Sequence, residues 1–253
     1  RATSIRRAVV FLFAVGLLHA ADPHNHNSLT AAERSAGWTL LFDGRSADAW
    51  IETTGERFPP TWRVEDGCLR TIVNPDSFQD LRSKGTWTDF EFGWEWKIAK
   101  GGNSGVKYLV QRTDKWNSRT GQGYHARARG FEYQLVDDAT NPDAKKDPSH
   151  VSAALYSYIV PRERVMKPAG EWNESRIVVR GQHVEHWLNG VRVVEFDSHS
   201  PDLLNKIRAK NRNDAAELES MKSRETPVVL QHHDSEVWFR CLRIRAPGAG
   251  NQK

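Results

Sequence analysis

Residues 88–97 show the clearest alternation of side-chain types in the sequence. Aromatic side chains take every second position, at Phe90, Phe92, Trp94 and Trp96. Because successive side chains of a β-strand point to opposite faces, the pattern predicts a strand with an aromatic core face. The opposite face of that strand would carry polar groups, among them Glu95.

Residues 130–138 repeat this arrangement. Phe131, Tyr133 and Leu135 share one face, while Glu132 and Gln134 fall on the other. We expect the first face to pack in a core. The second is either plainly solvated or carries chemistry, and the strand alone does not decide between these.

The rest of the chain indicates an all-β fold. Short alternating runs flank the turn dipeptides Asp66-Gly67 and Asn189-Gly190, which are typical of hairpins. Ten Trp and ten Phe against two Met also favour sheet over helix. With 253 residues in total, we expect one sandwich domain over residues 37–246.

Four segments complete this picture. Residues 111–130 are expected to form a long polar loop of the kind that often carries function, and residues 151–160 another strand. Residues 201–221 have loose helical spacing and predict a surface insertion of one or two short helices, interrupted near Arg212, with its basic side chains in solvent.

The two ends are expected to lie outside the domain. Three arginines, an apolar run and small residues make residues 1–21 a signal peptide for soluble export, with an uncleaved anchor as the alternative. Residues 22–36 would be a flexible leader with a capping box at Thr30 and Glu33, and residues 247–253 a disordered tail. The protein would then be periplasmic or secreted by a bacterium, without other membrane contact.

Charge and cysteine content narrow the partners. The formal net charge is +4, but residues 1–21 hold three arginines and no acid, so the remainder is nearly neutral. We therefore exclude nucleic acid as a partner. Cys68 and Cys241 either pair as a disulfide or are separate small core residues, and no metal-type cysteine spacing occurs.

Polar residues on three strands suggest a binding face. If the strands carrying Glu95, Lys107 and Glu132 are neighbours, their polar side chains form one row. Such a row, with aromatic residues nearby, suits a concave sugar-binding sheet. Ordinary two-carboxylate glycoside hydrolysis lacks its Glu-x-Asp-x-x-Glu spacing here, and no Gly-x-Ser-x-Gly elbow supports a serine hydrolase.

Motifs in a fixed order resemble the 3-keto-disaccharide hydrolase domain family. They are Leu-Leu-Phe-Asp-Gly at 40–44 with Trp50, Trp-Arg-Val-Glu-Asp-Gly at 62–67, Gly-Asn-Ser-Gly-Val-Lys-Tyr at 102–108, Gly-Phe-Glu-Tyr-Gln-Leu-Val-Asp at 130–137, Gly-Glu-Trp-Asn at 170–173, Val-Glu-His-Trp-Leu-Asn-Gly at 184–190 and Val-Trp-Phe-Arg at 237–240. The resemblance implies a concanavalin-A-like jelly-roll sandwich that cleaves glycosides whose sugar is oxidised at carbon 3. The sequence departs from the family at residues 230–234, which read Leu-Gln-His-His-Asp instead of Leu-Gln-Asp-His-Gly.

These considerations give a set of site residues. Glu132 or Glu95 would be the catalytic base, and Lys107 or a bound divalent cation would stabilise an enolate. Gln134 and Asn103 would orient the sugar. The remaining candidates for substrate binding are Tyr108, Trp116, His125, Tyr156, His186 and His233. Two alternatives stay open: a carbohydrate-binding module without turnover, and a structural surface domain.

Overall fold

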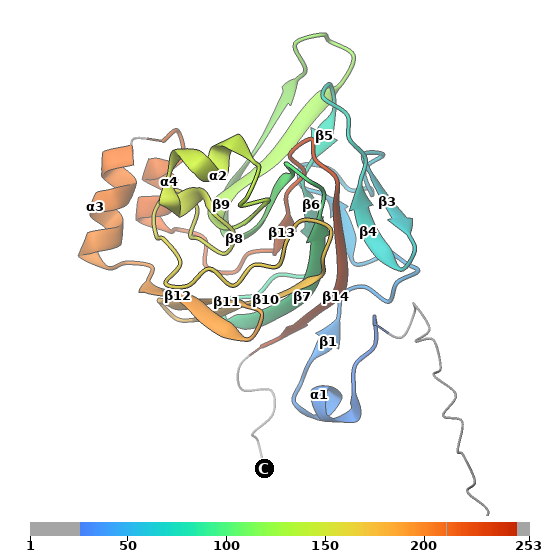
Figure 1. Ribbon diagram of the computed structural model, residues 1–253, viewed down its shortest axis with the longest axis horizontal. Coiled ribbons are helices and arrows are strands. Elements are labelled where there is room, and N and C mark those ends of the chain that lie inside the picture. Colours follow the sequence, from blue (N-terminus) through green and yellow to red (C-terminus); the bar gives the residue numbers. More distant parts are fainter. Residues whose placement is uncertain (1–25, 211, 247–253) are drawn as a thin grey trace, which may run out of the picture.

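The computed structural model describes residues 26–210 and 212–246 as two facing sheets (Figure 1). We name each sheet after a central strand. The β7 sheet runs in the order β12-β11-β10-β7-β14-β4-β3, with β1 also paired to β14, and the β8 sheet runs β2-β6-β13-β8-β9-β5. The expected jelly-roll sandwich is confirmed.

The strand bounds are as follows. The β7 sheet contains β1 (Thr39–Leu40), β3 (Trp62–Glu65), β4 (Cys68–Thr71), β7 (Phe90–Ile98), β10 (Asn173–Arg180), β11 (His183–Leu188), β12 (Val191–Asp197) and β14 (Val237–Arg245). The β8 sheet contains β2 (Trp50–Glu52), β5 (Phe78–Gln79), β6 (Leu81–Ser83), β8 (Asn103–Asn117), β9 (Tyr124–Val136) and β13 (Val229–Leu230).

The core lies between the sheets, and the alternation predicted both of its walls. All four aromatic residues of β7 are fully buried, as are Tyr133 and Leu135 of β9. The rings of Trp94 and Tyr133 meet edge to face across the two sheets, with centroids 5.0 Å apart. The hairpin at Asn189-Gly190 is also confirmed, and both residues have the positive φ that a type I′ turn requires.

The expected loop at residues 111–130 is wrong. β8 continues to Asn117 and β9 begins at Tyr124, so most of this segment is a paired hairpin that projects beyond the sandwich (Figure 1). The β8 side of the arm is mostly exposed, and the residues buried on its β9 side include only the small Ala126 and Ala128 beside His125, so the arm lacks the large apolar alternation of core strands. Sequence periodicity reports burial, and the arm offers little of it.

The expected strand at residues 151–160 is also wrong. The segment contains only isolated bridges, including Tyr133↔Leu155, and follows α2 (Pro142–Lys146) and a 3₁₀ turn (Pro148–His150). Ala153 and Ser157 have positive φ, which breaks an extended run. Val151, Ala153, Ala154, Leu155 and Tyr158 are buried all the same, and this burial explains the misleading pattern.

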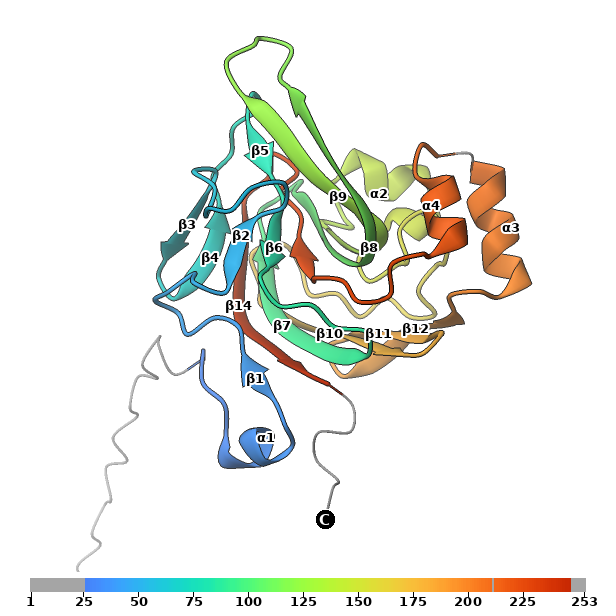
Figure 2. The same ribbon diagram turned by 180° about the vertical axis from the view of Figure 1, so that it is seen from behind.

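The insertion forms two helices, as expected: α3 (Pro201–Lys210) and α4 (Ala215–Ser220). Leu203, Ile207 and Leu218 are buried under them. Figure 2 shows both helices on the same side of the molecule as α2, next to β8 and β9.

The segment before the sandwich is more ordered than a flexible leader. α1 (Ala31–Ser35) begins at the predicted Thr30 capping box. The buried Asn27 amide donates to the Gly67 carbonyl (2.9 Å) and accepts from the Cys241 amide (2.7 Å). Cys68 and Cys241 are both buried and free. The expected signal peptide and tail lie outside the described residues.

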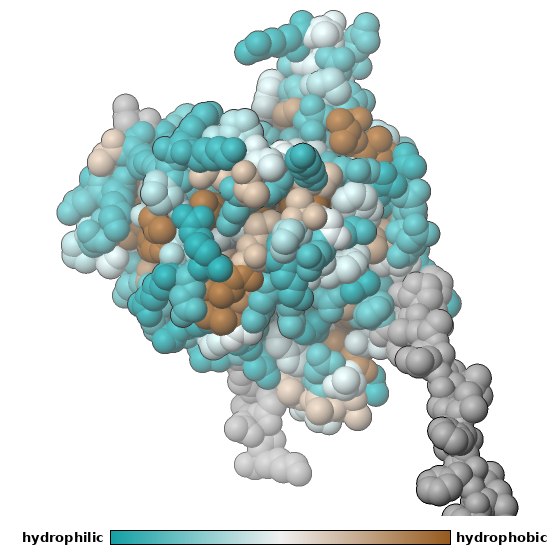
Figure 3. Space-filling model, in the orientation of Figure 1, coloured by the Kyte–Doolittle hydropathy of each residue, from teal (hydrophilic) through white to brown (hydrophobic). Residues whose placement is uncertain are grey.

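The surface is mostly polar. Figure 3 shows a largely hydrophilic side with separate apolar patches. Within residues 26–210 and 212–246, no helix is long and apolar enough to cross a membrane.

Candidate functional site

A polar pocket of about 180 Å³ lies on the face of β8 and β9 that points away from the core. Its polar lining consists of Asn103, Lys107, Arg127, Arg129, Glu132, Gln134, Tyr156, Arg212, Asp214, Gln231 and His233. The volume is below the roughly 300–1,000 Å³ of pockets for drug-sized ligands, so it suits a single ring better than a long chain.

The register of β8 and β9 places Glu132 in this pocket. Lys107 lies directly opposite Glu132, and Gly105 opposite Gln134, in the antiparallel pair. A Cβ atom on Gly105 would lie 2.6 Å from Glu132 Oε1. Since no real Cβ contact is that short, the carboxylate occupies space that only a glycine leaves free.

The Glu132 carboxylate is unpaired. Within the described residues it has no cationic group within 4 Å, although the pocket is lined by lysine and arginine side chains. Gln134 lies beside it: with the amide nitrogen turned toward the Ser104 carbonyl, that nitrogen also reaches Glu132 Oε1 at 3.3 Å. The carboxylate therefore keeps accepting capacity for a ligand.

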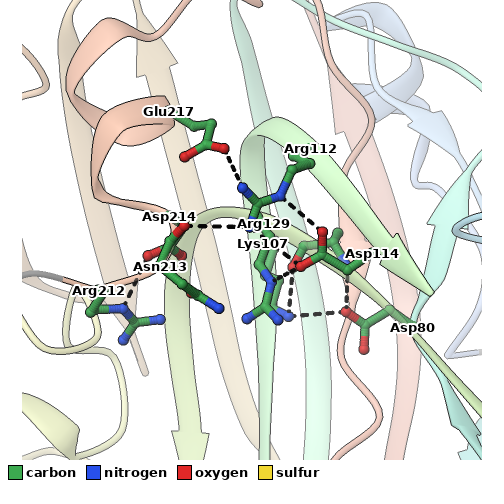
Figure 4. A network of polar contacts seen from close by, with 10 residues as sticks. Asp80, Lys107, Arg112, Asp114, Arg129, Arg212, Asn213, Asp214 and Glu217 are labelled. Atoms are coloured by element: carbon green, nitrogen blue, oxygen red, sulfur yellow. Dashed lines mark hydrogen bonds and ion pairs between the residues drawn. The ribbon is translucent and has the colours of Figure 1, made fainter. Parts of the chain in front are cut away.

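Lys107 is buried and held from two sides. Its Nζ donates to Asp80 Oδ2 and to the Ala128 carbonyl, both at 3.0 Å (Figure 4). Burial lowers the Lys107 pKa, while the negative charges of Asp80 and Glu132 act in the opposite direction. Asp80 also accepts from the main-chain amides of Ala128 and His232, so one carboxylate holds β8, β9 and the segment after β13 together behind the pocket.

Glu95 does not share this face, and the predicted row is wrong on this point. β7 belongs to the other sheet, where Glu95 lies opposite Arg240 of β14 and accepts from its Nε at 2.7 Å. The Arg240 guanidinium lies 3.8 Å from the Trp172 ring centroid. The alternation gave the correct face of the strand but not the sheet to which it belongs.

Tyr108 and His186 are core residues instead of pocket residues. Tyr108 Oη contacts His186 Nε2 at 2.7 Å, and His186 Nδ1 contacts the Ala153 carbonyl at 2.9 Å. Both residues are fully buried, and burial lowers the His186 pKa to about 4. The ring is thus neutral and serves as a polar link between the sheets.

Trp116 and His125 also lie outside the pocket. Both belong to the projecting hairpin, where their ring centroids are 5.3 Å apart. His125 packs at 3.9 Å against Phe78 of β5. Both residues therefore lie near the turn of the arm, one pair before Asn117 and Tyr124.

The other predicted binding residues do reach the pocket: Asn103, Gln134, Tyr156 and His233. Tyr156 Oη donates to Asp143 Oδ2 of α2 at 2.9 Å. His233 stands at the exposed rim; surrounding protein atoms and the Arg127 charge lower its pKa, while Glu132 opposes that shift. Its neighbour His232 points into the interior, donating to the Ile72 carbonyl at 3.0 Å.

Sequence reasoning missed the pocket residues Arg127 and Arg129. A β-bulge interrupts the register between Tyr108 and Arg112, opposite Gly130, whose Cβ would lie 2.6 Å from the Tyr108 carbonyl oxygen. A bulge changes which alternate positions face a given side. The odd-numbered arginines therefore line the same pocket as the even-numbered Glu132.

The insertion supplies two further residues that were missed, Arg212 and Asp214. Arg212 Nε donates to Asp214 Oδ1 at 3.2 Å (Figure 4). The Arg212 guanidinium also lies over the Tyr156 ring, 5.3 Å from its centroid. Asp214 is 2% exposed. The prediction that all basic residues of this segment are solvated is therefore wrong for Arg212.

The residues that could hold a divalent cation lie away from the pocket. Among the described residues, the group of three that could hold a metal is His183, Glu185 and Glu195, on the outer face of the β7 sheet. Arg192 already bridges those two carboxylates at 3.1 and 3.0 Å. Within residues 26–210 and 212–246, Glu132 belongs to no such group of three.

The geometry agrees with comparisons to known proteins. Residues 37–245 match the 3-keto-alpha-glucoside-1,2-lyase-like domain family. The chain belongs to this family. A relative from Bacteroides thetaiotaomicron, named 3-keto-disaccharide hydrolase, is 31% identical over 245 residues, which cover 86% of this chain and 84% of the relative.

Two crystal structures from Parabacteroides distasonis, both of proteins provisionally assigned as glycosyl hydrolases, are similar to this member of the lyase-like family. One is 28% identical with a TM-score of 0.72, covering 87% of this chain and 98% of its own. The other is 25% identical with a TM-score of 0.60, covering 83% and 98%.

Proposed function

We propose that this family member cleaves glycosides whose sugar carries a ketone at carbon 3, by elimination followed by hydration. Membership of the 3-keto-alpha-glucoside-1,2-lyase-like family supports the substrate class. The single structural observation that carries the proposal is the unpaired Glu132 carboxylate in a pocket with cationic walls.

The chemistry needs a base before it needs an acid. The ketone acidifies the proton on carbon 2, and Glu132 takes that proton while the C–H electrons form an enolate. When the enolate collapses, the bond from carbon 1 to the leaving oxygen breaks, and the departing group takes up a proton. Water then adds at carbon 1, and carbon 2 is protonated again, so the net reaction is hydrolysis.

The developing negative charge on the ketone oxygen requires a positive partner. Lys107 uses two of its three N–H groups on Asp80 and Ala128, which leaves one for the enolate oxygen. Because its two protein partners fix the ammonium in advance, no reorganisation is needed during the reaction. Gln134 and Asn103 are assigned to orienting the sugar ring.

We further propose that the reaction takes place after export, in the periplasm or outside the cell. The basic and apolar composition of residues 1–21 supports this location.

The decisive experiment compares two substrates that differ only at carbon 3. Purified protein should release p-nitrophenol from p-nitrophenyl 3-keto-α-glucoside and leave p-nitrophenyl α-glucoside intact. Equal cleavage of both would contradict the elimination mechanism. Binding of the keto-sugar in calorimetry without any release would favour the carbohydrate-binding alternative.

A further inference from the structure

Gln231 has a buried side-chain amide that the protein leaves unused. The residue follows β13, is 3% exposed and lines the pocket. Within the described residues its amide group makes no hydrogen bond, and Oε1 is buried without a partner. Its main chain is fixed, since its N–H donates to Gly105 O (2.8 Å) and its carbonyl accepts from Ser104 Oγ (2.7 Å).

Arg127 presents the complementary group in the same pocket. Its Nη2 donates to the carbonyl of His232, the residue after Gln231, at 3.3 Å, while Nε is buried without a partner. The other pocket cations each have a carboxylate: Lys107 has Asp80, Arg129 has Asp114 and Arg212 has Asp214. Among the described residues, Arg127 has none within 4 Å.

An unmade hydrogen bond in a buried place costs free energy, and folded proteins rarely leave one without a reason. Here a buried acceptor and a buried donor without protein partners belong to two residues that line one pocket, and main-chain hydrogen bonds hold the backbone of both. A carboxylate ligand would be repelled by the Gln231 oxygen. A sugar hydroxyl with a neighbouring oxygen matches both groups, because it can donate to one and accept from the other.

We propose that Gln231 and Arg127 form a subsite for a hydroxyl of the sugar that does not react, the 4- or the 6-hydroxyl. Gln231 Oε1 accepts from that hydroxyl, and Arg127 Nε donates to an oxygen of the same ring. This inference rests on the proposed function and adds to it a residue pair that recognises a part of the sugar other than the reacting carbons.

The test is a cycle between protein and substrate. The variant Gln231→Met removes the acceptor at similar size, and the substrates are p-nitrophenyl 3-keto-α-glucoside and its 4-deoxy and 6-deoxy forms. We expect the variant to lower kcat/KM on the full substrate by about fivefold to tenfold. On the deoxy form that lacks the bound hydroxyl, the variant should equal the unchanged protein.

Stability separates recognition from a structural role. Removing a buried amide that has no partner should leave Tm unchanged or raise it, whereas loss of a structural hydrogen bond would lower it. If Gln231→Met lowers kcat/KM by the same factor on the full substrate and on both deoxy substrates, Gln231 and the two hydroxyls act independently and the subsite is overturned. A Gln231→Met variant with unchanged kcat/KM on the full substrate would overturn it as well.

Failure of the proposed function is recognised separately. If the unchanged protein cleaves none of the keto-sugars, calorimetry with methyl α-glucoside and its 4-deoxy and 6-deoxy forms tests the subsite alone. The subsite is supported if the unchanged protein binds one deoxy form more weakly than methyl α-glucoside and the Gln231→Met variant binds these two sugars equally. Equal binding of all three sugars, or no binding, would overturn it.

Discussion

Strands β7 and β9 have the same sequence pattern, but their outward-facing glutamates have different surroundings. Each buries alternate aromatic residues against the other sheet, and each presents a glutamate on its outward face. Glu95 lies on the outside of the β7 sheet and is neutralised by Arg240, whereas Glu132 faces a pocket and has no ion pair within the described part of the chain. The two glutamates therefore differ in what surrounds the outward face of their strand. Segments far away in the sequence enclose the outward face of β9 as a pocket.

The largest expected effect separates the two glutamates directly. Glu132→Gln removes the base and should lower kcat by roughly 10²- to 10⁴-fold. Its matched control Glu95→Gln, on the other sheet, should keep activity within about twofold. Both are measured with the 3-keto-glucoside assay, and equal losses would remove the distinction drawn between the two faces. Retained binding by Glu132→Gln in calorimetry would also separate an enzyme from a binding module.

The ion pairs of the two sheets should differ in the same way. Asp80→Asn leaves the Lys107 ammonium buried without its charge partner, which typically costs about 3–5 kcal/mol of stability. For a chain of this size that lowers Tm by roughly 6–20 °C. The pair of Glu95 and Arg240 is more open to water, so Glu95→Gln should cost less than about 1 kcal/mol.

A rescue experiment checks the cause of that loss. Adding Lys107→Met to Asp80→Asn removes the stranded charge and should recover part of the Tm, while the double variant should lack activity because the ammonium proposed to stabilise the enolate is gone. A double variant no more stable than Asp80→Asn would contradict the assignment.

Two glycines extend the comparison to the backbone. Gly105→Ala should displace the Glu132 carboxylate, since the new Cβ would lie 2.6 Å from its Oε1, and lower kcat roughly tenfold to a hundredfold. On β7, a Cβ at Gly93 would have its nearest neighbour, Arg243 Nε, at an ordinary 3.5 Å. Steady-state kinetics should therefore find Gly93→Ala close to the unchanged protein; a similar drop in both would count against the steric explanation.

The smallest expected effect concerns pH and the buried histidines. Burial lowers the pKa of His186 and of His232 to about 4. Between pH 6.5 and about 4, these two histidines are therefore protonated in the unfolded chain but neutral in the folded chain. Their stabilising contribution is complete above pH 6.5 and is lost as the pH falls toward 4. His186→Gln should reduce the slope of unfolding free energy by up to about 1.4 kcal/mol per pH unit in that window, measured by urea denaturation. Adding His232→Gln should reduce it again, and an unchanged slope would show that the rings are protonated in the fold.

Much of the sandwich could be predicted because strands with one buried face have apolar residues at every second position. The alternating aromatic residues of β7 predict which face of the strand is buried, and Asn189-Gly190 predicts the type of turn. The arm of β8 and β9 and the irregular segment around Leu155 were misread because the first is little buried and the second is buried without being extended.

The site was predicted in part for a related reason. Lys107, Glu132 and Gln134 lie on strands that are adjacent in sequence and pair as a hairpin, so their proximity followed from local pattern. Arg127 depends on a bulge, and Arg212 reaches the pocket from a distant insertion. Neither the bulge nor the packing of the helices produces a repeating pattern of apolar and polar residues in the sequence.

The inserted segment with α3 and α4 reaches the pocket through Arg212 and Asp214, yet the strand pairs of both sheets are made without it. Over evolutionary time such a segment can lengthen, shorten or change its residues while the β-sandwich scaffold is inherited intact. Changes in this insertion would therefore alter the wall of the pocket while the pairing of β8 with β9 stays the same.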